Sequence, residues 1–117
     1  MSKTPGDYLR DLLQELDDIS AFSADGKDAF MADVKTQKAV VRSYEIVGEI
    51  AKRLPADMRA AHPYIDWRKL ITFRDFLAHN YDVIGLRYVW DAVEDVSHLR
   101  AGIEAILSGL DDRGKTA

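Results

Sequence analysis

The chain has 117 residues, 47% of them hydrophobic, and a formal net charge of −4 at pH 7. This length predicts one domain, residues 1–117, and leaves no room for a separate catalytic domain. The absence of cysteine excludes disulfides and thiolate chemistry and favours a reducing cytoplasm. There is neither a signal-like apolar segment nor a run approaching the roughly 20 residues of a membrane span, so we expect a cytoplasmic protein with no membrane contact.

The charge is spread unevenly along the chain. Residues 1–34 sum to −5, residues 35–74 to +5 and residues 75–117 to −4. The middle third could therefore form a basic surface, which would suit a nucleic acid, or it could be an ordinary solvated mixture of charges. The sequence leaves both interpretations open.

The first expected helix spans about residues 5–22. Thr4 and Pro5 are typical of an N-cap followed by proline at the first helical position, and leucines then recur at helical spacing. After a turn at residues 23–26, an apolar stripe predicts one long second helix that ends at Pro55. Gly48 lies inside this helix, where glycine costs about 1 kcal/mol against alanine. Close contact with a neighbouring helix would explain it.

Residues 56–62 predict one or two further turns. Asp66 can cap a third helix that ends near residues 80–82, and a stripe from about Gly85 to Leu110 predicts a single fourth helix followed by a polar, frayed tail at 111–117. The core should therefore span about residues 5–110. The predicted fold is all-α, an antiparallel four-helix up-and-down bundle with a short extra helix.

One stretch of the third helix combines side chains that suit RNA cleavage. Arg74, His79 and Tyr81 have the form Arg-x4-His-x-Tyr. Histidine titrates near neutral pH and can move the proton of a ribose 2′-hydroxyl, while arginine can hold a phosphate and offset its growing charge. Tyr81 could contact the phosphate or stack on a base, and Asp75 could orient an imidazole or an arginine. No metal or other cofactor is required.

Helical geometry limits how these groups can act together. At about 100° per residue, positions 74 and 79 point to different sides of a regular helix. They can meet at one phosphate if the helix unwinds beyond Leu77, or if a second chain supplies its own pair across a two-fold axis. We favour the homodimer.

Other interpretations of the same residues are structural. Tyr81 could pack at the helix end, and Asp75 could be a surface charge. Trp67 and Trp90 are expected in the core, His62 in a loop, and His98 on the solvent face or at an edge of the core. The three histidines lack metal-site spacing, so no metal site is predicted.

On these residues the chain resembles the HepT-like ribonuclease toxins of the HEPN superfamily, over about residues 7–110. The motif Arg74-x4-His79-x-Tyr81 carries the resemblance, with support from residues 33–39 and 46–50, from Trp67 and Ile71, and from Val89-Trp90. Family members often have Asn after the arginine and Gly between histidine and tyrosine, where this chain has Asp75 and Asn80. Asp75 thus adds a negative charge beside the phosphate site. Asp75 and Asn80 are predicted to be supporting residues of the candidate site.

The resemblance implies a homodimeric helical bundle whose Arg74 and His79 line an RNA cleft, with transfer RNA among the substrates. It also implies a type VII-like toxin–antitoxin pair, in which a minimal nucleotidyltransferase antitoxin attaches AMP to Tyr81 and can form a larger hetero-oligomer with the toxin. Two alternatives stay open. One is a non-catalytic helical partner that binds nucleotide or substrate for a nucleotidyltransferase, and the other is a dimerisation bundle without a ligand.

Overall fold

The computed structural model describes residues 3–79 and 83–116, although the side chains of residues 74, 78, 79, 83, 84 and 111–116 lie outside the description. The described residues form helices and no strand, which confirms the predicted all-α class. The helices are α1 (Pro5–Phe22), α2 (Lys27–Ala32), α3 (Val34–Arg53), α4 (Ala56–Ala61), α5 (Trp67–His79), α6 (Val83–Glu94) and α7 (Val96–Thr116).

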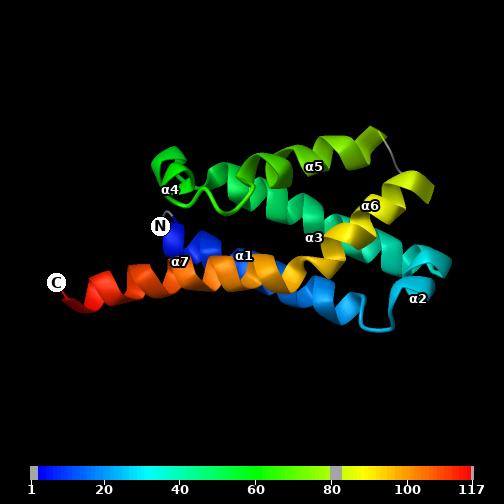
Figure 1. Cartoon of the computed structure of the whole chain (residues 1–117), viewed down its shortest axis with the longest axis horizontal. Coiled ribbons are helices and arrows are strands. Elements are labelled where there is room, and N and C mark those ends of the chain that lie inside the picture. Colours follow the sequence, from blue (N-terminus) through cyan, green and yellow to red (C-terminus); the bar gives the residue numbers. More distant parts are fainter. Residues whose placement is uncertain (1–2, 80–82, 117) are drawn as a thin grey trace.

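The long helices run up and down the bundle. α1 packs on α3 and α7, and α3 also packs on α5. In Figure 1, α5 lies along α3 at one side of the molecule, and α7 lies with α1 at the other. α6 leads from the end of α5 to α7, and the short α4 joins α3 to α5. The predicted four-helix arrangement is confirmed, with α6 and α7 together taking the place of the fourth helix.

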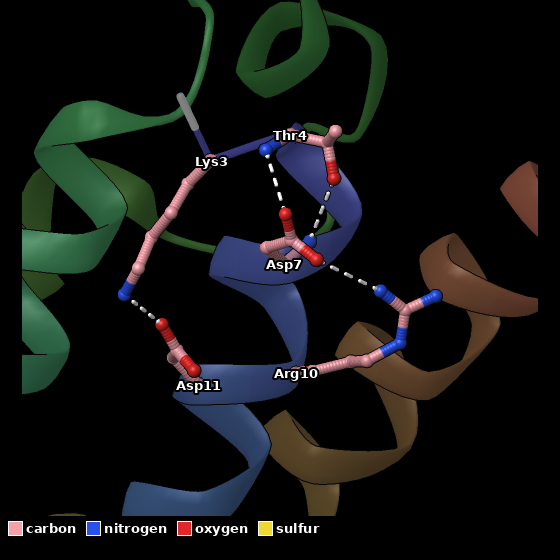
Figure 2. Close-up of polar contacts among 5 residues, drawn as sticks. All are labelled: Lys3, Thr4, Asp7, Arg10 and Asp11. Atoms are coloured by element: carbon pink, nitrogen blue, oxygen red, sulfur yellow. Dashed lines mark hydrogen bonds and ion pairs between the residues drawn. The ribbon is translucent and has the colours of Figure 1, made fainter. Parts of the chain in front are cut away.

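The first helix begins as predicted. The Thr4 hydroxyl accepts a hydrogen bond from the backbone N–H of Asp7 at 3.1 Å, and the Asp7 carboxylate accepts one from the backbone N–H of Thr4 at 2.9 Å (Figure 2). Such a reciprocal pair satisfies two donors that the helix itself leaves unpaired. Ion pairs of Lys3 with Asp11 and of Arg10 with Asp7 lie beside it (Figure 2). Local sequence thus fixes the start of α1.

The prediction of one long second helix was wrong, because the chain breaks at Asp33. This residue has extended backbone angles, φ −122° and ψ 106°, and its carboxylate accepts hydrogen bonds from the backbone N–H of Lys35 and the hydroxyl of Thr36. The buried amide of Gln37 donates to the carbonyls of Phe30 and Met31 at 2.9 and 3.1 Å. These bonds satisfy backbone groups that the break exposes.

The break lets α2 bury its aromatic residue. Phe30 is fully buried, and its ring centroid lies 5.5 Å from that of Trp90 in α6. If α2 and α3 were one straight helix, residue 30 would lie on the extension of the α3 axis instead. Burial of a phenylalanine is worth about 1.5–3 kcal/mol, which helps to offset the lost helical turn.

The single fourth helix was also a wrong prediction. The chain turns at Asp95, between α6 and α7, and the carbonyl of Asp95 then accepts the first hydrogen bond of α7, from the N–H of Leu99 at 3.1 Å. α6 starts at Val83, slightly earlier than the predicted Gly85, and the α7 backbone remains helical to Thr116, where the sequence predicted a frayed tail. The apolar stripe continues through the turn, so periodicity alone could not reveal it.

Candidate active site on helix α5

Helix α5, which carries the motif, is held firmly at its first residues. The Asp66 carboxylate accepts a hydrogen bond from the N–H of Lys69 at 3.0 Å, as expected for an N-cap. Trp67 is buried, and its indole N–H donates to the carbonyl of His62 at 3.1 Å. The cap and the buried indole together fix where α5 starts and how it is rotated about its axis.

The middle of α5 crosses α3 at close range. A Cβ built at Gly48 would lie 2.8 Å from the carbonyl oxygen of Leu70, closer than real Cβ contacts come. The prediction that Gly48 marks a close helix contact is therefore confirmed. One step further along, the rings of Tyr44 and Phe73 lie with centroids 5.3 Å apart. These two contacts set the antiparallel register of α3 and α5.

The α5 backbone is helical through His79, so the alternative in which the helix unwinds beyond Leu77 is wrong. The helix does not unwind after Leu77, which is itself buried. Positions 74 and 79 are five residues apart and so lie about 140° apart around the helix axis. The side chains of Arg74 and His79, and the whole of Asn80 and Tyr81, lie outside the described residues. The predicted roles of these four residues remain predictions.

Asp75 is the one supporting residue of the motif whose side chain is described. It is exposed, and it makes neither a hydrogen bond nor an ion pair with the residues that the structure describes. The described residues therefore contain no partner that Asp75 orients. Its predicted role toward an imidazole or an arginine stays untested.

Six of the nine basic residues of the middle third lie at the two opposite ends of the α3–α5 pair. Lys35 and Lys38 are exposed near the start of α3, which the antiparallel register places at the motif end of α5. Lys52 and Arg53 are exposed at the far end of α3, about 25 Å away at 1.5 Å per residue. Arg68 and Lys69 lie at that same far end. These six residues therefore do not gather in one basic surface, which was one of the two possibilities that the sequence left open.

A row of aromatic rings links the buried side of α5 to the surface. It passes from Tyr44 through Phe73 and Phe76 to Tyr88 on α6, with a final centroid distance of 5.4 Å and an interplanar angle of 81°. Tyr88 is 56% exposed. Phe76 lies inside the motif, between Arg74 and His79, so this contact brings an exposed aromatic ring to the motif helix. Tyr88 was not among the candidate residues predicted from the sequence, because it lies off the apolar stripe of its helix.

The remaining aromatic and histidine residues are placed largely as predicted. Trp67 and Trp90 are core residues, His62 lies in the loop after α4, and His98 is exposed. Trp90 also donates from its indole N–H to the Glu94 carboxylate at 2.7 Å. Within the described ranges there is no group of three or more side chains suited to hold a metal ion.

The up-and-down helical bundle and the sequence Arg-x4-His-x-Tyr, of which Arg74 and His79 lie on α5, are features of the HEPN superfamily. The family model described as Ribonuclease HepT-like matches residues 12–106, and the chain belongs to this family. The sequence-based prediction of a ribonuclease is confirmed at the level of the family.

Relatives from several organisms agree with this assignment. The chain is 36% identical to "Probable ribonuclease HepT" of Thermococcus cleftensis, over 91% of this chain and 98% of the relative. It is 41% identical to "Putative RNase MJ0127" of Methanocaldococcus jannaschii, over 74% of this chain and 72% of the relative. A third relative, "Putative RNase TTE0752" of Caldanaerobacter subterraneus, is 33% identical over 90% of this chain and 96% of its own length. No solved structure matches the chain significantly.

None of the helices, over the residues described, is both long enough and apolar enough to cross a membrane.

Proposed function

We propose that this protein is a metal-independent endoribonuclease in which His79 moves the protons and Arg74 holds the scissile phosphate. One His79 removes the proton of the ribose 2′-hydroxyl, whose oxygen attacks the adjacent phosphorus. The 5′-oxygen leaves and takes a proton from a second imidazole. Arg74 offsets charge on the pentacoordinate transition state. The products are a 2′,3′-cyclic phosphate and a free 5′-hydroxyl.

The observation that carries this proposal is the motif on α5 in a chain of the Ribonuclease HepT-like family. Arginine and histidine are sufficient for this reaction, because the nucleophile is part of the substrate and both proton transfers occur near neutral pH. Tyr88 supports the proposal, since an exposed ring packed on the motif helix is suited to stack on an unpaired base.

The site is proposed to form between two protomers. Because α5 is regular to His79, positions 74 and 79 of one chain diverge around the helix and are poorly placed to reach one phosphate. A two-fold axis beside α5 would bring Arg74 of one protomer toward His79 of its partner. The two histidines would then divide the acid and base roles.

We also propose a means of control through Tyr81. In a type VII-like toxin–antitoxin pair, a minimal nucleotidyltransferase would transfer AMP to its phenol, adding bulk and negative charge beside the phosphate site. RNA would then be repelled and excluded. The proposed substrate is cytoplasmic RNA, with transfer RNA as one candidate.

Incubation of purified protein with total RNA in EDTA tests the central proposal. Wild type should cleave in the presence of the chelator, while Arg74→Ala and His79→Ala should lose at least a hundredfold in rate. His98→Ala, which removes an exposed histidine elsewhere, is the matched control and should cleave normally. Inactive wild type, or activity that chelation abolishes, would instead favour the non-catalytic partner or a metal-dependent enzyme.

A further inference from the structure

A groove separate from the motif lies between α5 and the α6–α7 pair. Its volume is about 780 Å³, within the range of small-molecule sites. Leu70 and Phe73 of α5 line one wall, Asp91 and Asp95 line the other, and Tyr44 of α3 lies between them. The lining combines apolar side chains with a few polar groups, which is the usual composition of a ligand site.

Tyr44 contributes a polar atom without a partner. The residue is 2% exposed, and its buried Oη makes no hydrogen bond. Burial, together with the negative charge of Asp95, raises the pKa of the phenol far above its ordinary value, so it stays neutral at physiological pH. Buried hydroxyls nearly always have a hydrogen-bond partner. A ligand in the groove could supply it.

The charges on the groove favour a cation. Asp91 lies in the last turn of α6 and Asp95 at the turn between α6 and α7, and both line the groove. Both are exposed, and neither forms an ion pair with a residue that the structure describes. Asp66 lines the opposite side with Lys69 beside it, and His98 also lines the groove. The carboxylates thus outnumber the ammonium group.

We propose that this groove binds a linear organic cation of the polyamine class. One ammonium group would lie between Asp91 and Asp95 and donate a hydrogen bond to the phenol oxygen of Tyr44. The methylene segments would lie on Leu70 and Phe73, and a second ammonium group would reach Asp66. Alternating charges and methylenes fit a groove whose carboxylates are separated by apolar surface.

Other occupants fit the charges less well. RNA would bring phosphates to a wall of unpaired carboxylates. A second copy of the chain docked groove to groove about a two-fold axis would place the same carboxylates against one another. A divalent metal lacks a cluster of three suitable ligands among the described residues. An alkylammonium ion avoids all three difficulties.

Calorimetric titration of the full chain with spermidine, without RNA, tests this proposal. Wild type should bind one equivalent, and Asp91→Asn with Asp95→Asn should weaken binding at least tenfold. Asparagine preserves the size of both side chains. The matched control, Asp25→Asn with Asp57→Asn, removes the same charge at exposed positions away from the groove and should bind as wild type. Equal weakening by both pairs would overturn the proposal, because it would indicate non-specific attraction.

The variant Tyr44→Phe is a second, independent test of the proposed site. It removes only the unpartnered hydroxyl, so the fold should be retained, and binding should weaken severalfold. Unchanged affinity in this variant would remove the phenol from the site and overturn the proposed geometry. N-acetyl-lysine methylamide, with one ammonium group, should bind at least tenfold more weakly than spermidine. Equal binding would instead assign the groove to a lysine of a protein partner. None of these measurements depends on RNA cleavage.

Discussion

Gly48 and Leu70 bring the backbones of α3 and α5 into direct contact. A Cβ at Gly48 would lie 2.8 Å from the Leu70 carbonyl oxygen, and the atom in the way belongs to the backbone of α5 rather than to a flexible side chain. The contact can therefore be relieved only by moving a helix. Since α5 carries Arg74 and His79, this crossing positions the candidate active site.

Gly48→Ala should not stabilise the protein, although alanine is the better helix former. Overpacking costs about 1–3 kcal/mol, against about 1 kcal/mol gained in helix propensity. Urea denaturation should therefore give an unchanged or lower free energy of unfolding, and RNA cleavage should fall with the displacement of α5. Gly109→Ala in α7 is the matched control, because nothing lies within 4 Å of its Cβ. It should be stabilising by up to about 1 kcal/mol. Equal stabilisation by both substitutions would contradict the close crossing.

If Tyr88 stacks on a base, Tyr88→Ala should raise KM for RNA. Base stacking on an aromatic ring is worth about 1–3 kcal/mol, so a rise of roughly tenfold is expected with little change in kcat. Tyr88→Phe keeps the ring and should behave as wild type. Tyr64 is a similarly exposed tyrosine before the start of α5, and Tyr64→Ala should leave KM unchanged. A monomeric Tyr88→Ala, found by light scattering, would assign the ring to a subunit interface instead.

Mixed dimers should reveal whether the active site is shared between protomers. If one shared site needs both histidines, a mixed dimer of wild type and His79→Ala has one of the two imidazoles and should be inactive. Co-refolding equal amounts of the two proteins should therefore leave about a quarter of the rate of a fully wild-type sample, because about a quarter of the dimers contain two wild-type protomers. A rate of about half would mean that each chain acts alone.

The cap of α3 should make the fold sensitive to acid. The Thr36 hydroxyl, followed by backbone N–H groups, lowers the pKa of Asp33 below its ordinary value of 3.8. The ionised cap therefore stabilises the folded chain above that value, and this contribution is lost as the pH falls through the lower folded pKa. Asp33→Asn still accepts the capping bonds but does not titrate there. The melting temperature of wild type should fall more steeply than that of Asp33→Asn from about pH 4 to about pH 2. Parallel curves would contradict this role of the carboxylate.

Much of the fold could be predicted because its signals are local. Thr4 and Asp66 cap helices through residues three positions away, and the helical repeat of apolar residues identified the core stripes. Gly48 could be singled out because glycine is unfavourable within a helix. Arg74, His79 and Tyr81 could also be selected from the sequence alone, because their side-chain chemistry and their spacing along the chain do not depend on the fold.

The breaks at Asp33 and Asp95 were visible only in the structure. The apolar stripe continues through both positions, and only the burial of Phe30 against Trp90 shows why α2 turns away from α3. The contact of Tyr88 with the motif helix and the groove over Tyr44 likewise join residues far apart in the chain. The sequence by itself determined which segments are helical and which side chains can do chemistry, because these follow from neighbours within one or two turns. Only the tertiary structure decided which side chains share a surface, because that depends on how separate helices pack.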